Sequence, residues 1–361
     1  MRVAIRADAS SAIGTGHIHR MLSLARVLKA QGAQVLFVTR PLGMDTQKMI
    51  TSGGFDVALL SAPCASFEAN AAIPHSHWAK VSQDQDSIET IALLKKRWVD
   101  RVVVDHYAFD RQWHNRVEAD LETPTMVIDD LADRPLGGCW IVDQNYHPDH
   151  MAKFEGKLKC KTVLLAGPSY SMLDPRYADA PRYRFSESVR SVGVFMGGVD
   201  ARHDTLSAID ALDAAGWNGP LEVVVTRHTH GASAVERRLA QWPHATVSRD
   251  LPNLAEFFAR HDLQIGAGGG AVWERCCIGA PTIGLVCAAN QAESIPYANA
   301  AGFLIGIDFM SEPDRRRNAL VKAIGLAISQ PRKRATLSAN ARRLVDGRGA
   351  ERLAIALMME G

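Results

Sequence analysis

Short apolar runs alternate with longer amphipathic stretches along most of the chain, and this alternation is the strongest constraint on its fold. It predicts βα units, in which helices cover both faces of parallel sheets. A helix with one apolar face is expected after the first strand and should end at Gly32, and further helices are expected near 86–98 and 110–120. The strands predicted in this way are 3–6, 35–38, 57–60, 101–104, 125–128, 192–196, 221–225, 262–265 and 282–286.

The chain of 361 residues is long enough for two such domains. A polar segment from Ala178 to Arg190 contains Pro181 and lacks periodicity, so we expect the linker there. The fold class is therefore α/β, with an N-terminal Rossmann-like domain over 1–180 and a C-terminal one over 181–361. The last 45 or so residues have helical periodicity, and the final helix is a candidate to pack back on the first domain.

Composition excludes several classes of function. The 41 basic and 39 acidic residues leave a net charge of +2, which is too small to hold nucleic acid or an anionic membrane by charge. The six cysteines show no C-x-x-C spacing, so a zinc ribbon or a disulfide framework is not expected. Since the N-terminus is no signal peptide and no run of about 18 apolar residues occurs, we expect a cytoplasmic, monomeric protein without membrane insertion.

Parallel α/β sheets bind ligands at the carboxyl ends of their strands, and polar or glycine-rich segments follow several predicted strands. These positions are the first candidates for a functional site. They are Asp8 to His17, Asp105 to Tyr107, Asp129 and Asp130, Met196 to Gly198, and Gly266 to Glu274.

The first segment ends in Ile13-Gly14-Thr15-Gly16-His17, whose glycines let backbone N–H groups approach a polar ligand. His17 lies in the first turn of the predicted helix, where the helix dipole disfavours an imidazolium. A neutral His17 could accept a proton from water as a general base. The alternative is a histidine that only caps the helix or packs against it. Three pairs of histidines have i, i+2 spacing: His17/His19, His75/His77 and His228/His230. The first pair would not share a helix face and the others lack a cluster of carboxylates, so no metal site is predicted.

Asp105-His106-Tyr107 brings polar side chains to one point of the sheet edge, and the alternative is a hydrogen-bonded turn. Asp129, Asp130 and Asp133 have the D-D-x-x-D spacing of magnesium-diphosphate sites, but they end a strand rather than lie on a helix. Anchoring of the loop or contacts to a sugar are therefore favoured over a metal.

Gly266 to Ala271 matches the relaxed G-x-G-x-x-A pattern of dinucleotide sites, but no acidic residue follows at the expected distance. Backbone binding of phosphate is favoured over NAD. Glu274 could bind ribose hydroxyls or could simply stabilise a helix end, and Asn290, followed by Gln291, could be an N-cap without any ligand.

Taken in order, the motifs R-A-D-x-S-x-x-I-G-T-G-H-x-x-R (6–20), D-H-Y (105–107), I-D-D-L (128–131), M-G-G-x-D (196–200) and G-A-G-G-x-x-x-W-E (266–274) span most of the chain. The chain resembles the PseG family, the UDP-2,4-diacetamido-2,4,6-trideoxy-β-L-altropyranose hydrolases of pseudaminic acid biosynthesis. The resemblance implies a glycosyltransferase-B-like (GT-B-like) fold, with two Rossmann-like domains facing across a cleft. It implies inverting attack of water on the UDP-sugar, with no cofactor and no metal.

Carried over to this sequence, the resemblance makes His17 the base. The substrate-binding residues that it implies, with those that follow from strand-end placement, are Asp8, Gly14, Gly16, Arg20, Tyr107, Gly197, Gly198, Gly268, Gly269, Gly270, Glu274, Asn290 and Gln291. The family's G-S-S-T-W-E reads Gly269 to Glu274 here, without the hydroxyl groups, so backbone N–H groups would have to bind the phosphates. Three alternatives stay open: a UDP-sugar glycosyltransferase of the same fold, a catalytically weak nucleotide-sugar-binding protein and, more remotely, an NAD-dependent enzyme.

Overall fold

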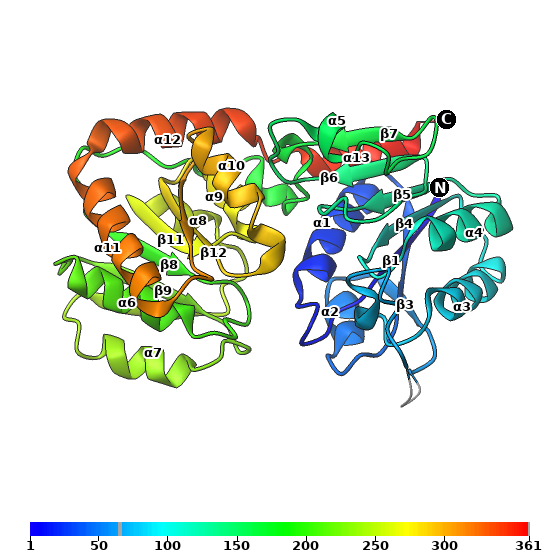
Figure 1. The fold of residues 1–361 in the computed structure, drawn as a ribbon, viewed down its shortest axis with the longest axis horizontal. Helices are drawn as coiled ribbons and strands as arrows, with labels where there is room; N and C mark the ends of the chain where they lie inside the picture. The colour runs from blue at the N-terminus through cyan, green and yellow to red at the C-terminus, as the bar shows by residue number, and fades with distance from the viewer. Residues whose placement is uncertain (64–66, 360–361) are drawn as a thin grey trace. The chain divides into compact units, whose positions relative to one another are not determined.

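The computed structural model describes residues 1–63 and 67–359, which form two compact units. Unit 1 contains Met1–Asn145, Asp149–Pro175 and Arg348–Gly361, and unit 2 contains Tyr146–Pro148 and Arg176–Gly347. The chain therefore enters unit 2 after Pro175, whereas the polar segment predicts the change at 180, and it returns to unit 1 at Arg348. Each unit is built around one parallel sheet (Figure 1).

The sheet of unit 1 has seven strands in the order β3-β2-β1-β4-β5-β6-β7, and every neighbouring pair is parallel. Parallel strands need crossover connections, which the helices provide. The strands are β1 (Arg2–Ala7), β2 (Gln34–Thr39), β3 (Asp56–Leu59), β4 (Arg101–Asp105), β5 (Thr125–Ile128), β6 (Trp140–Asp143) and β7 (Val163–Ala166).

Helices cover both faces of this sheet, because successive side chains of a strand point to opposite faces. Val3 and Ile5 of β1 pack with α1 (Gly16–Ala30) and α13 (Gly349–Met358), whereas Ala4 packs on the other side with α3 (Gln83–Lys95) and α4 (Arg111–Leu121). Figure 1 shows α3 and α4 across the sheet from α1. The shorter helices of this unit are α2 (Thr46–Ser52), η1 (Ser76–Trp78), α5 (His150–Lys153) and η2 (Pro168–Tyr170).

The sheet of unit 2 has six parallel strands in the order β10-β9-β8-β11-β12-β13. They are β8 (Val192–Phe195), β9 (Leu221–Val225), β10 (Ala245–Arg249), β11 (Leu263–Ala267), β12 (Thr282–Val286) and β13 (Ile305–Asp308). The helices are α6 (Asp204–Ala214), α7 (Ala232–Leu239), α8 (Ala255–Arg260), α9 (Ala271–Ile278), α10 (Ser294–Ala300), α11 (Pro313–Ser329) and α12 (Pro331–Leu344), with η3 (Pro175–Tyr177) and η4 (Ala289–Gln291).

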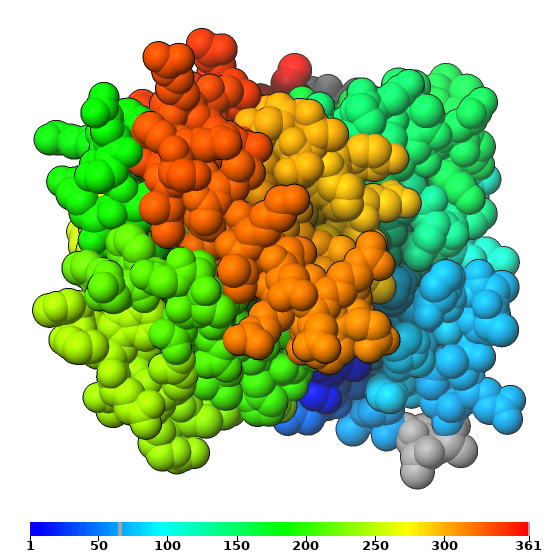
Figure 2. All heavy atoms as spheres, turned by 60° about the vertical axis from the view of Figure 1, so that its left-hand side comes forward, coloured from blue at the N-terminus to red at the C-terminus, as the bar shows by residue number. Residues whose placement is uncertain are grey.

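The core of unit 2 packs the valines and leucines of β8 and β9 against α6, α7 and α11. Leu320 and Ile324 are the fully buried positions of α11, one turn apart on its inner face. The outer faces of α11 and α12 are polar and form part of the surface of unit 2, drawn in orange and red-orange in Figure 2. Among the helices that the structure describes, none combines the length and the apolar character that crossing a bilayer requires.

The α/β fold with two Rossmann-like units is confirmed, and nine strands lie within two residues of their predicted positions. The prediction missed β6, β7, β10 and β13, which are four or five residues long and carry polar or exposed positions. Cys139, Cys160, Cys276, Cys277 and Cys287 are free thiols, and Cys64 lies outside the described residues.

Helix α13 carries both a buried and an exposed apolar residue, and substituting each one tests how this helix stabilises unit 1. Leu353 of this helix is fully buried in the same core cluster as α1, whereas Ile355 is 53% exposed. We expect Leu353→Ala to lower the free energy of unfolding by about 2–5 kcal/mol, because it leaves a cavity. Ile355→Ala should change it by less than about 0.5 kcal/mol. Equal effects of the two substitutions in urea unfolding would contradict the packing of α13 described above.

Both sheets reverse their strand order at one point, and the loops at that point are the ones that the sequence singles out. In unit 1 the reversal lies between β1 and β4, and in unit 2 it lies between β8 and β11. Loops diverge there at the carboxyl ends of the strands and leave room for a ligand. The segments Asp8 to His17 and Asp105 to Tyr107 thus meet in unit 1, and Met196 to Gly198 meets Gly266 to Gly270 in unit 2.

Candidate functional site

The end of β1 and the end of β4 lie side by side, since Ala7 pairs with Asp105. The turn after β1 is closed by a hydrogen bond from the Gly14 N–H to the Ser10 carbonyl. Gly14 has φ +77°, a conformation that residues with a side chain rarely adopt, so a glycine suits this turn. The turn starts α1 at Gly16 and puts His17 in its first turn, beside β4.

His17 and Asp105 form a hydrogen-bonded pair. The Nδ1 atom of His17 lies 2.7 Å from Asp105 Oδ1, and the His17 side chain is 10% exposed while that of Asp105 is fully buried. A carboxylate accepts hydrogen bonds only, so Nδ1 carries a proton, and in the neutral imidazole the lone pair is then on Nε2. Nε2 bonds no residue that the structure describes, which leaves it able to take a proton from a ligand.

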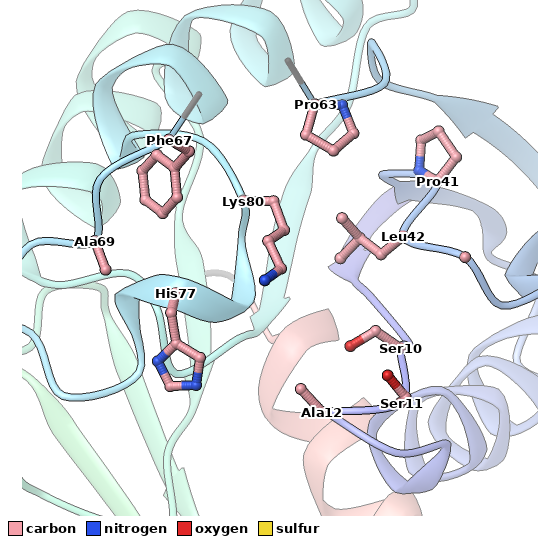
Figure 3. A pocket seen from close by; sticks show the side chains of 11 residues that line it. Ser10, Ser11, Ala12, Pro41, Leu42, Pro63, Phe67, Ala69, His77 and Lys80 are labelled. Carbon is pink, nitrogen blue, oxygen red and sulfur yellow. The ribbon is translucent and has the colours of Figure 1, made fainter. Parts of the chain in front are cut away.

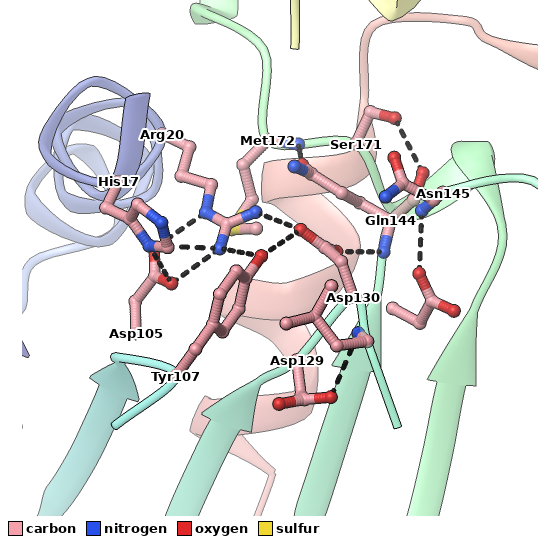
Figure 4. A network of polar contacts seen from close by, with 12 residues as sticks. His17, Arg20, Asp105, Tyr107, Asp129, Asp130, Gln144, Asn145, Ser171 and Met172 are labelled. Atoms are coloured by element: carbon pink, nitrogen blue, oxygen red, sulfur yellow. Dashed lines mark hydrogen bonds and ion pairs between the residues drawn. The ribbon is translucent and has the colours of Figure 1, made fainter. Parts of the chain in front are cut away.

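Arg20, one turn further along α1, holds the carboxylates around His17 in place (Figure 4). Its guanidinium donates to both oxygens of Asp105, at 2.5 and 2.6 Å, and to Asp130 Oδ2 at 2.5 Å. Such two-pronged contacts fix geometry as well as charge. The Tyr107 hydroxyl donates to the same Asp130 oxygen at 2.6 Å and accepts from Arg20 at 3.2 Å.

The charges of this network reinforce one another. Burial opposes ionisation of Asp105, but the charge of Arg20 and the hydrogen bonds from Arg20 and His17 hold the pKa of its carboxyl well below the usual value. Burial, together with the neighbouring carboxylates, raises the pKa of the Tyr107 hydroxyl well above its usual value. Around neutral pH, Asp105 is therefore a permanent anion against His17, and Tyr107 remains a hydrogen-bond donor to Asp130.

Two aromatic rings enclose the imidazole of His17. The ring of Tyr107 meets it edge to face with 4.9 Å between centroids, and the ring of Trp78, from η1, does so at 5.9 Å. Trp78 and Tyr107 also contact each other, with centroids 5.6 Å apart. Aromatic rings packed against the imidazole lower the local dielectric, which strengthens the interactions of charged groups there.

Asp8, which the sequence predicts as a substrate contact, has protein partners on both carboxylate oxygens. Its side chain is fully buried and accepts hydrogen bonds from the Arg6 guanidinium, the Thr39 hydroxyl and the Arg40 backbone N–H. His106 Nε2 lies 3.2 Å from its other oxygen. No lone pair is free to face a ligand, so we assign Asp8 to the support of the β1 and β4 loops.

The aspartates after β5 divide between two tasks. Asp129 anchors its own loop by accepting from the Leu131 and Ala132 N–H groups, whereas Asp130 joins the His17 network. Asp133 pairs with Arg134 at 2.8 Å. Within residues 1–63 and 67–359, no three His, Cys, Asp or Glu side chains are grouped as metal ligands.

In unit 2 the glycines lie in the two loops of the strand-order reversal. Gly197 has φ +93°, and the Gly198 carbonyl accepts from the Thr226 hydroxyl. Gly268 is buried against Ile295, whereas Gly270 is exposed at the start of α9. The N–H groups of Val272 and Trp273 in the first turn of α9 donate to the Gly269 and Gly270 carbonyls. The positive dipole end of the helix at this point suits an anionic phosphate.

The other predicted residues of unit 2 differ in their contacts and in their exposure to solvent. Glu274 interacts with the Tyr177 hydroxyl, whose pKa is raised by burial first and then by this carboxylate. Gln291 accepts from the Cys287 N–H at 2.8 Å, and Asn290 beside it is exposed. Val272 is fully buried, so the position where the family has a hydroxyl belongs to the core of this chain.

The glycines of the β11–α9 loop allow a direct test of phosphate binding. A Cβ at Gly268 would overlap Ile295 Cγ1 and lie 3.1 Å from the Leu285 carbonyl, so Gly268→Ala must displace the loop. A Cβ at Gly270 meets no atom within 4 Å, and its backbone is helical. We expect Gly268→Ala to raise the Kd for UDP at least about tenfold and Gly270→Ala to leave it within about twofold. Calorimetry with UDP measures both dissociation constants, and melting temperatures establish that both variants are folded. An unchanged affinity in Gly268→Ala would show that the β11–α9 loop does not bind the phosphates.

Sequence reasoning assigned no substrate or catalytic role to Asp105 or Trp78, and for Asp130 it favoured loop anchoring or sugar contacts without connecting it to His17. Asp105 and Asp130 stand in the quoted D-H-Y and I-D-D-L motifs, but their contact with Arg20 depends on which strands are neighbours. Trp78 lies in a segment without periodicity, and no sequence signal connects it with His17.

The chain is similar to known proteins at low identity. No family model matches it. It is 22% identical over 361 residues to the spore coat polysaccharide biosynthesis protein SpsG of Bacillus subtilis, covering 98% of this chain and 96% of that protein. It is 20% identical over 300 residues to the uncharacterized protein MJ1062 of Methanocaldococcus jannaschii and spans 55% of that protein's length.

Solved structures resemble the whole chain in fold. MurG of Acinetobacter baumannii superposes with a TM-score of 0.66 at 13% identity, covering 99% of both chains. A UDP-glucosyltransferase of Polygonum tinctorium gives a TM-score of 0.69 at 12% identity, again over 99% of both chains. The spinosyn rhamnosyltransferase SpnG, bound to thymidine diphosphate, gives 0.63 at 18% identity over 99% of this chain and all of that chain. The chain therefore has the fold of GT-B glycosyltransferases.

Proposed function

We propose that this protein cleaves the glycosyl–phosphate bond of a nucleoside-diphosphate sugar, with His17 as the general base. The observation that carries the proposal is the His17–Asp105 pair, whose 2.7 Å hydrogen bond leaves Nε2 as a proton acceptor. A base at a strand-order reversal, where α/β sheets bind ligands, is placed for chemistry rather than for packing.

The reaction that fits one base is a single displacement. The oxygen of a hydroxyl group attacks the anomeric carbon while its proton passes to His17 Nε2. The bond from the anomeric carbon to the phosphate oxygen breaks, and the nucleoside diphosphate leaves with the electron pair. Asp105 stabilises the imidazolium that forms, and Arg20 keeps Asp105 in position. Attack opposite the leaving group inverts the anomeric configuration.

The nucleotide fits unit 2. The positive dipole end at the start of α9 and the turn at Gly197 suit a diphosphate. A diphosphate is a stable leaving group, so its developing charge can be stabilised at this helix end without a general acid. The similarity to nucleotide-sugar-dependent transferases, together with the glycine motifs, supports UDP as the nucleotide.

Transfer to an acceptor hydroxyl is the candidate that the comparisons favour. The solved structures with this fold include a glucosyltransferase and a rhamnosyltransferase, and SpsG is a polysaccharide biosynthesis protein. The attacking group would then be a sugar hydroxyl, and the product would be a glycoside.

Hydrolysis is the second candidate, and one observation favours it. The motif from Arg6 to Arg20 resembles that of the PseG hydrolases. In that case the donor would be a UDP-2,4-diacetamido-2,4,6-trideoxy sugar, and the product would be the free sugar for pseudaminic acid synthesis.

One experiment tests the common proposal and separates the two candidates. The purified protein is incubated with UDP-sugars in water enriched in ¹⁸O, with and without acceptor glycans, and UDP and sugar products are followed by mass spectrometry. Release of UDP with ¹⁸O in the free sugar identifies hydrolysis, and release that depends on an acceptor identifies transfer. Absence of UDP release from every donor, including the 2,4-diacetamido sugar, would contradict the proposal.

A further inference from the structure

A second cavity in unit 1 adjoins the His17 site. It has a volume of about 540 Å³, within the usual range of small-molecule sites, and its lining includes Ser10, Ser11 and Ala12 of the β1–α1 turn. On the other side, η1 connects the two places, because His77 lines the cavity while its neighbour Trp78 packs against His17. A ligand in this cavity would therefore contact η1 and the β1–α1 turn, the two segments that also lead to the His17 site.

The cavity has a polar side and an apolar side (Figure 3). The Lys80 ammonium extends into the space between His77 and the Ser10 and Ser11 hydroxyls. Leu42 and Phe67, with Pro41, Pro63 and Ala69, supply the apolar wall. Such a wall suits the C–H face of a sugar ring, and the ammonium with its hydroxyls suits an anion.

Lys80 lacks an anionic partner of its own. It forms no ion pair with any residue in the described part of the chain, although many of the other charged groups around the β1 and β4 loops are paired. Its backbone has φ +57°, the left-handed conformation that residues with a side chain rarely adopt. Strain of this kind is commonly found at functional sites, where it fixes the direction of a side chain.

We propose that this cavity, formed by Ser10, Ser11, His77 and Lys80 against Leu42 and Phe67, binds the acceptor, a sugar that carries a carboxylate or phosphate group. The inference rests on the proposed function and deepens it, since an acidic acceptor in this cavity would present its hydroxyl to His17. Lys80 binds the anionic group, the serine hydroxyls donate hydrogen bonds to it, and Phe67 stacks on the ring.

Binding of small probes tests the inference without turnover. D-glucuronate carries the carboxylate, glucose 6-phosphate carries the phosphate, and glucose is the neutral control. Their dissociation constants are measured by ligand-observed NMR with the wild type, Lys80→Gln, Ser11→Ala and the control Lys96→Gln, whose lysine is exposed at the end of α3. Melting temperatures establish that each variant is folded.

We expect at least one acidic probe to bind the wild type at least about tenfold more tightly than glucose, and Lys80→Gln to remove this preference. Ser11→Ala should weaken it several-fold, and Lys96→Gln should leave it unchanged. Equal binding of acidic and neutral probes, or acidic binding that survives in folded Lys80→Gln, would overturn the inference. UDP release is measured separately, so acid binding through Lys80 without UDP release would contradict the proposed function and not this cavity.

Discussion

His17→Gln is expected to lower the rate of UDP release by about 10²–10⁴-fold while the Kd for UDP stays within about twofold. In the proposed reaction Nε2 of His17 takes the proton of the attacking hydroxyl, whereas the proposed nucleotide site lies in unit 2. Glutamine is of similar size and keeps a donor toward Asp105, so the charge network should survive. Steady-state kinetics with a saturating UDP-sugar, and calorimetry with UDP, measure the two quantities.

His19→Gln is the matched control, because His19 lies on the same helix and is exposed. It should have the wild-type rate. A His17→Gln enzyme with at least half of the wild-type turnover would remove His17 from the mechanism. A loss of UDP affinity equal to the loss of rate would instead indicate that His17 contributes to binding.

Asp105→Asn is expected to lower kcat by about 10²–10⁴-fold, although Asp105 touches no substrate atom in the proposed reaction. An asparagine can present its N–H₂ group to His17 Nδ1, which would move the ring proton to Nε2 and block proton uptake. It also removes the anion that stabilises the imidazolium and leaves the Arg20 guanidinium with weaker acceptors. Rate measurements should therefore show a fall in kcat with little change in the Kd for UDP.

The free energy of unfolding of Asp105→Asn, measured as a function of pH, provides a control for the kinetic result. The strongly lowered pKa of Asp105 means that its ionisation stabilises the fold above the pKa of an unfolded aspartate and is lost only in acid. The deficit in stability of Asp105→Asn should thus be constant from pH 5 to 8 and shrink below about pH 4. Asp120→Asn, on an exposed turn of α4, should match the wild type. Normal kcat in folded Asp105→Asn would contradict the role of the pair.

The strands that the sequence predicts are those with apolar side chains on both faces. Strands such as 101–104 and 221–225 read as continuous valine-rich runs, because helices cover both sides of the sheet. Strand β10 contains Thr246, Ser248 and Arg249 and lies at the edge of its sheet, so its sequence does not differ from that of a loop. Edge position and shortness are tertiary properties, which a local pattern does not contain.

The residues of the candidate site also differ in whether local sequence features could predict them. His17 could be predicted because a glycine turn and a helix start are local features of the sequence. Its partner could not be assigned, since 88 residues separate His17 from Asp105 and only the pairing of β1 with β4 brings them together. Asp8 is the opposite case. It stands at a strand end as a ligand-binding residue would, but Arg6 and Arg40 occupy its carboxylate.

The direct test of the central claim is the anomeric configuration of the first product. Proton NMR of the wild type with a UDP-sugar that it cleaves resolves the anomeric signal before mutarotation equilibrates a free sugar, or permanently for a glycoside. A single displacement with His17 as base predicts that the first product has the inverted configuration. A first product of retained configuration would require a covalent intermediate or a front-face attack, and would contradict this account.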